Sequence, residues 1–211
     1  PLPPDAQPVD YNAPTDDPQL SAIIDYAKHR KLHTADTTLY WTPNAAYTNR
    51  IIIPFTHDNK TVGWSARTIL PNKKPKYISE SQPGFVYNTD SQTYDKKYCI
   101  VCEGIFDAML IGGCALLSSD IGKQQATLLN SLNKQMILLP DRDTSGKNTV
   151  DQAIELGWAV SFPPWEPGIK DAADAVQRYG TLYTLYAIIQ HTQYTSLKIK
   201  LAAKTWFNTT A

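Results

Sequence analysis

Two aspartates at the end of an apolar run are the residues of this sequence best suited to chemistry. Asp141 and Asp143 follow the run at residues 136–139 and precede a small-residue turn that ends at Gly146. If the run is a buried strand, side chains two residues apart point the same way, so the two carboxylates lie side by side. Two such charges repel unless a cation or a proton lies between them. The pattern favours a magnesium site; the alternative is a solvated turn, because Asp and Gly are common in turns.

Three further carboxylates stand at similar places in the chain. Glu103 follows the apolar run at residues 98–102, and Asp107 lies four residues later, about one helical turn. Asp171 precedes another helical pattern. Each of these acids is therefore expected near the end of a strand or the beginning of a helix.

The elements around these acids predict an α/β fold. Between residues 98 and 180, short apolar runs alternate with helical patterns, which is typical of a parallel sheet flanked by helices on both faces. The carboxyl ends of parallel strands lie at one edge of the sheet, where open α/β folds bind their ligands. We therefore expect the acids to converge at that edge.

A basic stretch lies upstream. Five cations and no acid occur from Lys60 to Lys76, among them Arg67 and Lys74, and aromatic residues such as Tyr77 are interleaved with them. This mixture suits phosphates and stacked bases. The alternative is a solvated hairpin, because charge runs often only solvate a surface. The chain as a whole carries 20 basic and 20 acidic residues, which argues against a histone-like binder.

Cysteine content and hydropathy limit the class of protein. Cys99, Cys102 and Cys114 form no disulfide framework and fit a reducing cytoplasm, and the Cys99/Cys102 pair lacks the second pair of ligands that structural zinc needs. We therefore predict no zinc in this chain. No apolar run reaches the length of a membrane span, and no secretory signal is visible. Because the chain begins with Pro, we expect its amino terminus to result from a cut.

We expect four segments. Residues 1–18 form a Pro-rich linker, residues 19–92 a smaller mixed α+β basic subdomain, residues 93–180 the parallel-sheet domain, and residues 181–211 a helical tail. The tail would either cap the core or dock a partner, and capping is favoured.

Three segments resemble the three motifs of a TOPRIM domain, the metal-binding module of bacterial-type primases, type IA and II topoisomerases and some nucleases. They are residues 101–107 (VCEGIFD), 139–147 (LPDRDTSGK) and 168–174 (GIKDAAD). Residues 50–55, 63–67 and 74–79 resemble the amino-terminal basic subdomain of bacterial-type, DnaG-like DNA primases. The likeness covers residues 19–180, and its compactness resembles that of a tailed-phage primase.

The resemblance implies a nucleotidyltransferase that synthesises short RNA primers on single-stranded DNA during DNA replication. It implies Mg²⁺ as cofactor, with Mn²⁺ as the alternative ion, and ribonucleoside triphosphates as substrates. A replicative helicase is an expected partner, and a zinc-binding module is expected in a missing amino-terminal part. Expected metal ligands are Glu103, Asp107, Asp141, Asp143 and Asp171, of which Glu103, Asp141 and Asp143 would be catalytic; Arg67, Lys74, Lys76 and Lys147 would contact nucleotide or template.

The third motif departs from the primase pattern. Asp171 matches the first Asp of the usual Asp-Pro-Asp, but Ala173 occupies the second Asp position and Asp174 is shifted by one residue. Two other functions therefore stay open. One is a TOPRIM nuclease that hydrolyses phosphodiesters with the same carboxylates, and the other is a non-catalytic scaffold that binds single-stranded nucleic acid.

Overall fold

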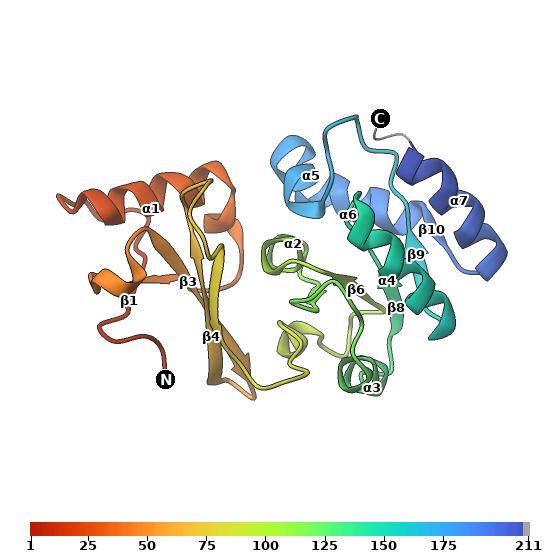
Figure 1. Cartoon of the computed structure of the whole chain (residues 1–211), viewed down its shortest axis with the longest axis horizontal. Coiled ribbons are helices and arrows are strands. Elements are labelled where there is room, and N and C mark those ends of the chain that lie inside the picture. The colour runs from red at the N-terminus through yellow and green to blue at the C-terminus, as the bar shows by residue number, and fades with distance from the viewer. Residues whose placement is uncertain (209–211) are drawn as a thin grey trace. The chain divides into compact units, whose positions relative to one another are not determined.

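A computed structural model describes residues 1–208 of the chain. The chain divides into two compact units, Pro1–Pro83 and a second unit that begins at Gly84 (Figure 1). Each unit has its own sheet, and each is described separately below. No helix within residues 1–208 is long and apolar enough to cross a membrane.

The first unit is built on an antiparallel sheet with strand order β1-β2-β3-β4-β5. Asp58 and Asn59 make the tight turn between the two longest strands with positive φ angles of 50° and 59°, as the predicted hairpin requires. The strands are β1 (Gln7–Pro8), β2 (Tyr40–Trp41), β3 (Arg50–His57), β4 (Lys60–Thr68) and β5 (Tyr77–Glu80), accompanied by α1 (Pro18–His29) and the 3₁₀ helices η1 (Leu32–Thr34) and η2 (Ala45–Tyr47).

The central strand β3 is buried from Arg50 to Phe55, which explains the dense apolar run in its sequence. Helix α1 adds Ile23, Ile24 and Ala27 to the buried residues of this unit. Its first turn is fixed by Asp17, whose Oδ1 accepts hydrogen bonds from the backbone N–H groups of the second and third residues that follow it, at 2.8 and 3.1 Å.

The structure corrects the interpretation of residues 1–18 as a linker. Strand β1 pairs with β2, and the backbone N–H of Val9 donates to Leu39 O at 2.8 Å. Leu2 and Ala6 pack against the sheet, and Val9 is buried. Prolines do not prevent this pairing because β1 is an edge strand, where a missing N–H leaves no gap in the ladder.

The second unit contains the predicted parallel sheet, with strand order β10-β9-β8-β6-β7. Strands β6 (Tyr98–Cys102), β7 (Cys114–Ala115), β8 (Gln135–Leu138) and β9 (Ala159–Ser161) are parallel to their neighbours, and β10 (Thr192–Gln193) is antiparallel to β9. The helices are α2 (Ile105–Ile111), α3 (Lys123–Ser131), α4 (Thr144–Glu155), α5 (Ala172–Tyr179), α6 (Thr181–Gln190) and α7 (Ser196–Asn208), with a 3₁₀ helix η3 (Thr89–Ser91).

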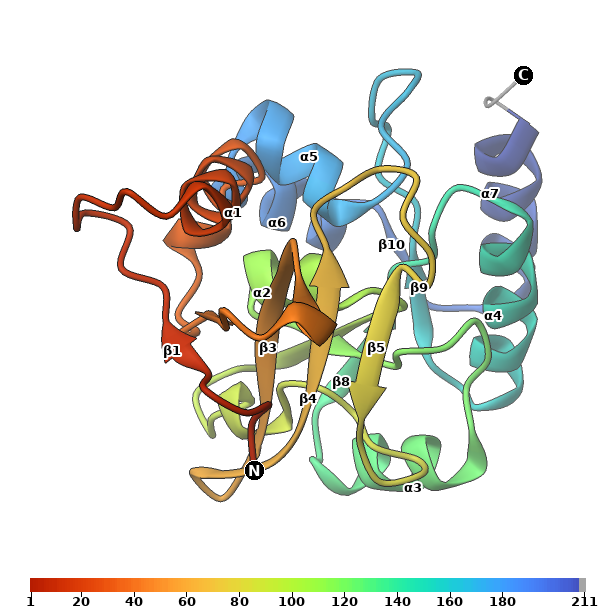
Figure 2. The ribbon, with the colours of Figure 1, turned by 60° about the vertical axis from the view of Figure 1, so that its left-hand side comes forward.

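Helices cover both faces of this sheet, which confirms the expected fold class. Val101, Leu138 and Val160 share one buried cluster with residues of α3, α4 and α7. Because side chains alternate along a strand, Cys102 and Ile137 point to the opposite face. Helices α2, α5 and α6 pack against one another, and Figure 2 shows them on the other side of the strands from α4 and α7.

The boundary between the units lies earlier than the sequence predicted. Tyr87 and Ala115 exchange two backbone hydrogen bonds, and Asn88 Nδ2 donates to Gly113 O at 2.8 Å, so residues 84–92 belong to the second unit rather than to the basic subdomain.

The expected helical tail forms α6, β10 and α7. Ile199, Trp206 and Phe207 of α7 are buried in the core, which agrees with the capping role; residues 209–211 of the predicted tail lie outside the described residues.

Candidate functional site

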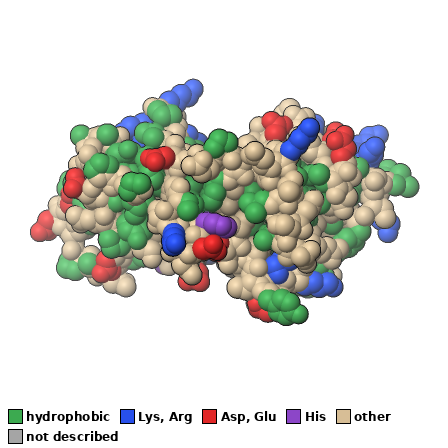
Figure 3. Space-filling view, turned by 90° about the horizontal axis from the view of Figure 1, so that it is seen from below, with side chains coloured by type: hydrophobic (Ala, Val, Ile, Leu, Met, Phe, Trp, Pro, Cys, Tyr) green, Lys and Arg blue, Asp and Glu red, His purple; other side chains and the backbone are tan. Residues whose placement is uncertain are grey.

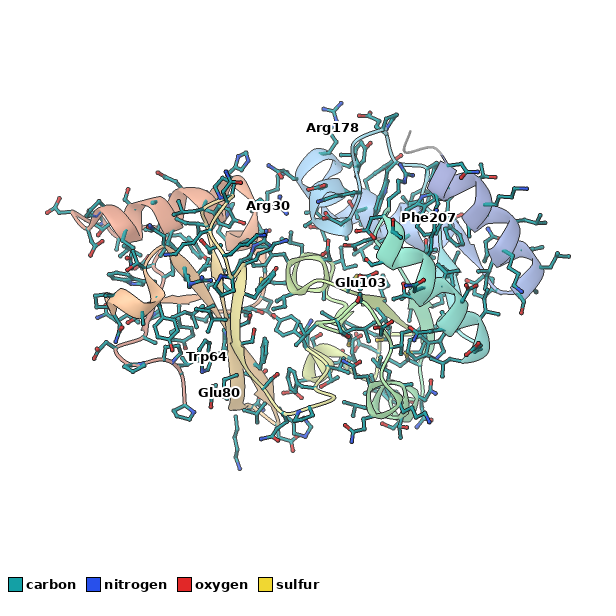
Figure 4. All side chains as sticks on the ribbon, viewed as in Figure 1. Arg30, Trp64, Glu80, Glu103, Arg178 and Phe207 are labelled. Atoms are coloured by element: carbon teal, nitrogen blue, oxygen red, sulfur yellow. The ribbon has the colours of Figure 1, made fainter. Side chains whose placement is uncertain are left out.

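The predicted acids gather at the carboxyl edge of the parallel sheet. Glu103 directly follows β6, and Figure 4 labels it there, next to α2. Asp141 lies in the short turn after β8, and Asp143 caps the amino terminus of α4. Asp171 caps the amino terminus of α5, after the loop that leaves β9. Each of these acids therefore follows a parallel strand, as the alternating pattern predicted.

Hydrogen bonds join these segments. Ser145 Oγ lies 3.1 Å from Glu103 Oε2 and 2.7 Å from Asp143 Oδ1, so one hydroxyl is within hydrogen-bonding distance of both acids. Asp107 is 7% exposed, and its Oδ1 accepts a hydrogen bond from Ala173 N at 2.8 Å. The turn after β8 is therefore tied to β6, and the first turn of α2 is tied to α5.

Asp141 lies among four other carboxylates. Burial and the charges of Asp107, Glu103, Asp171 and Asp143 raise its pKa from 3.8 to about 8. Burial also raises the pKa of the Cys102 thiol, and the Asp107, Asp141 and Asp171 charges raise it further. These mutual effects are those of acids that share one small region.

Glu103 and Asp143 have opposite electrostatic environments. Burial, helped by the Asp143 charge, raises the pKa of Glu103. The Oε1 atom of Glu103 is buried and has no hydrogen-bond partner among the described residues. Burial alone would raise the pKa of Asp143 too, but hydrogen bonds from Ser145 and Gly146 and the Lys170 charge hold it below its ordinary value. The raised pKa suits Glu103 to accept a proton, whereas the lowered pKa keeps Asp143 ionised.

Two glycines allow the close approach of these segments. A Cβ atom at Gly146 would collide with the backbone oxygen of Asp141, and one at Gly104 would collide with Asp107 Oδ2. The small residues of the motifs are therefore required by packing. Within residues 1–208, no three of the five acids place one oxygen each within 4.8 Å of one another. The carboxylates therefore lie near one another, but their oxygens are not close enough together to surround one ion as a set of three ligands.

The basic residues expected to bind nucleotide or template lie in the first unit. Arg67 of β4 is half-buried, and its Nη1 donates to Tyr77 Oη at 2.8 Å, while Lys74 and Lys76 are exposed. Lys76 Nζ lies 5.7 Å from the centroid of the Tyr77 ring. Figure 3 shows basic and acidic side chains interspersed on one face of the molecule, in keeping with the balanced charge of the sequence.

Lys147 lies apart from the acids. It is an exposed residue of α4, and its Nζ is 5.6 Å from the centroid of the Phe207 ring. Figure 4 labels Phe207 on α7, next to α4. The structure therefore directs Lys147 toward α7 and not toward the carboxylates.

Sequence reasoning missed two buried arginines. Arg50 is 2% exposed, and its guanidinium donates to the carbonyls of Ala66, Lys76 and Pro75 at 3.1, 3.3 and 2.7 Å, which fixes the segment that carries Lys74 and Lys76. Arg142, between the two aspartates of the motif, is 6% exposed, and its backbone N–H donates to Lys170 O at 2.8 Å. The alternation of side chains along an extended chain was the available signal, since it points Arg142 away from Asp141 and Asp143.

Similarity to known proteins agrees with this fold. The fold is that of the catalytic cores of DnaG primases, shown by two solved structures. The catalytic domain of a DnaG primase bound to ssDNA superposes with a TM-score of 0.65 and 15% identity, covering 83% of this chain and 73% of that one. The E. coli primase catalytic core superposes with a TM-score of 0.59 and 16% identity, covering 89% of this chain and 64% of that one.

A sequence relative is the DNA primase of Aquifex aeolicus (strain VF5), 23% identical over 153 residues, which cover 64% of this chain and 31% of the relative. The solved zinc-binding and RNA polymerase domains of the Aquifex aeolicus primase superpose with a TM-score of 0.57 and 23% identity, covering 84% of this chain and 50% of that one. The chain thus spans about a third of the curated relative and half of that solved chain. No protein-family model matches it. The predicted resemblance to bacterial-type primases is confirmed, and the resemblance to a tailed-phage primase stays a prediction.

Proposed function

We propose that this chain is the RNA-polymerase core of a bacterial-type DNA primase, which synthesises short RNA primers on single-stranded DNA. One observation carries the proposal: carboxylates from three separate segments meet at the carboxyl edge of the parallel sheet, in a chain with the fold of primase catalytic cores. A solvated turn would leave its acids exposed, whereas Asp141 is half-buried among four other acids, which is unfavourable unless a cation or a proton lies between them.

The donor set fits Mg²⁺, with Mn²⁺ as the alternative. All candidate ligands are carboxylates, the donors that hard divalent cations prefer, and the raised pKa of Asp141 is what acids without a counter-charge display. Glu103, Asp141, Asp143 and Asp171 would hold the ions. Bound magnesium would activate the attacking hydroxyl and neutralise the triphosphate.

The residues of the chain then have distinct roles. Primer extension joins the 3′-hydroxyl of the RNA to the α-phosphate of a ribonucleoside triphosphate and releases pyrophosphate. Glu103 would take the proton of the hydroxyl, because its pKa is raised and its Oε1 is buried without a partner among the described residues. Asp143 stays ionised beside it. Asp107 is a positioning residue, since it holds the first turn of α5 through Ala173 N.

The cationic residues would bind the phosphates. Arg67 suits paired contacts with phosphate oxygens, while Lys74 and Lys76 act as point charges on the segment that Arg50 holds. Lys147 is proposed to contact the nucleic-acid backbone from the exposed side of α4. The relatives suggest a single-stranded DNA template and a separate zinc-binding module. A replicative helicase is a further proposed partner, and the cytoplasm the proposed compartment.

Incubation with single-stranded DNA, radiolabelled ribonucleotides and Mg²⁺ tests the proposal. A primase core yields a ladder of short RNA, and this ladder should be absent with Asp141→Ala. The ladder should be retained with Asp174→Ala. Asp174 is shifted by one residue from the second Asp of the primase motif, a position that Ala173 occupies here. Shortened DNA without new RNA would replace the proposal with the TOPRIM nuclease. Binding of DNA with neither product would favour the scaffold.

A further inference from the structure

A groove between α4 and α7 brings together three lysines of the second unit. It has a volume of about 320 Å³, and the cations that line it are Lys147 of α4 and Lys200 and Lys204 of α7. All three side chains are exposed. The two helices pack against each other, and Figure 1 shows them side by side. We call this space the α4–α7 groove.

The chain itself does not neutralise the lysines of the α4–α7 groove. Asp151 is the one acid among the described residues that line it, and the ion pairs described within residues 1–208 include neither this acid nor any of the three lysines. Lys200 and Lys204 are four residues apart on one face of α7, a spacing at which like charges repel. Three lysines against one aspartate leave two positive charges in excess, although the whole chain has balanced charge.

Lys147 is directed across the groove toward the lysines of α7. Its Nζ lies 5.6 Å from the centroid of the ring of Phe207, a buried residue of α7. This cation–π contact brings a third positive charge to a helix that has no acid of its own, since residues 181–208 include no Asp or Glu. A convergence of like charges is unfavourable by itself, so it points to an anionic partner from outside the chain.

The α4–α7 groove begins close to the carboxylates of the candidate site. Asp143 caps the amino terminus of α4, and Lys147 follows four residues later, about one helical turn. Asp151, another turn along α4, lines the same groove. A chain of phosphates in the groove therefore leads along α4 to the edge of the sheet at which Asp143 lies.

We propose that the α4–α7 groove binds the sugar–phosphate backbone of single-stranded DNA. The inference rests on the proposed function, which requires a polyanion at the amino terminus of α4. Lysine ammonium groups contact phosphates as point charges, and such contacts position a strand without reading its sequence. The volume is that of a small-molecule site, so the groove accommodates one strand, a few nucleotides at a time. This contact is separate from the basic stretch of the first unit.

The salt dependence of DNA binding tests the inference. The full chain is titrated into fluorescein-labelled oligothymidylate in EDTA, where no RNA is made, and fluorescence anisotropy gives Kd at several salt concentrations. Each phosphate contact to a single strand adds about 0.7 to the slope of log Kd against log salt concentration, so the triple variant Lys147→Gln, Lys200→Gln, Lys204→Gln should lose about 2 from that slope.

A second triple variant is the matched control. Lys97→Gln, Lys123→Gln and Lys198→Gln remove the same charge at exposed lysines of the second unit that do not line the groove, and should change the slope by less than about 0.7. Equal slopes for the two triple variants would overturn the inference, because DNA binding would then respond only to the net charge of the chain.

Lysine acetylation of the unmodified chain gives a measurement that does not depend on the folding of any variant. Oligothymidylate should protect Lys147, Lys200 and Lys204 from acetylation, followed by mass spectrometry, and should leave Lys198 and Lys123 reactive. Acetylation of the groove lysines that DNA does not change would overturn the inference, and an RNA ladder in the priming assay would still support the proposed function. Protection of the groove lysines without any RNA ladder would instead contradict the proposed function alone.

Discussion

Replacing Asp141 with Asn should stabilise the metal-free chain at pH 8 while removing the proposed activity. The pKa of Asp141 rises from 3.8 to about 8 because of burial and four neighbouring acids. Between these values the folded chain binds more protons than the unfolded chain, so stability is greatest below pH 3.8 and falls as the pH rises to 8. Asparagine keeps the shape of the side chain and removes the charge.

The size of the pKa shift of Asp141 limits how much stability the Asp141→Asn substitution can add. At about 1.4 kcal/mol per pKa unit, the shift of the Asp141 pKa corresponds to at most about 6 kcal/mol, and water that enters the turn will relax part of this. We therefore expect Asp141→Asn to gain about 2 kcal/mol at pH 8, which for a chain of this size is a rise of about 4–8 °C in the midpoint of thermal unfolding. At pH 5 the gain should be smaller, because wild-type Asp141 is then protonated.

Circular dichroism melts in EDTA at pH 5 and pH 8 measure the effect. Asp143→Asn is the matched control: the pKa of Asp143 is lowered, so removal of its charge should not stabilise the chain at either pH. Added Mg²⁺ should raise the midpoint of the wild type and not that of Asp141→Asn. An Asp141→Asn midpoint equal to or below that of the wild type at pH 8 would refute the electrostatic reasoning.

Three further predictions concern packing and phosphate contacts. Gly146→Ala should lower stability by about 1–3 kcal/mol in a denaturant titration, because its Cβ would collide with the backbone of Asp141; unchanged stability would mean that the turn moves freely. Arg50→Met should cost about 3 kcal/mol, since three carbonyls lose their donor, and a melt with no loss would contradict its clamping role. Lys76→Ala should raise the Michaelis constant for ribonucleotides severalfold in primer synthesis and leave Mn²⁺ binding unchanged. The control Lys123→Ala on α3 should change neither quantity. A Michaelis constant unaltered by Lys76→Ala would favour the alternative that the basic stretch is only a solvated hairpin.

Local patterns were enough to predict the parallel sheet and the meeting of its acids. The strands that precede Glu103 and Asp141 are apolar runs, because helices cover both their faces, and Gly or Pro stands two residues after the end of each strand. The convergence then follows from the direction of parallel strands, without knowledge of any contact.

Features that depend on distant partners were not predictable in this way. Residues 1–18 look like a linker because their prolines and acids show no periodicity, and they become ordered only by pairing with β2 and packing on the sheet. Strand β10 has two residues and no pattern of its own. The direction of Lys147 depends on Phe207 of α7, sixty residues away, and Arg50 finds its acceptors in a segment that follows β4.

Titration of the chain with Mn²⁺, followed by electron paramagnetic resonance of the free ion, tests the central claim most directly. The account predicts saturable binding that weakens by tenfold or more in Asp141→Asn and in Asp143→Asn, and that is unchanged in Asp120→Asn, an exposed acid in the loop before α3. Mn²⁺ binding of equal strength in all four proteins would contradict it, because the carboxylates at the edge of the sheet would then not form the metal site.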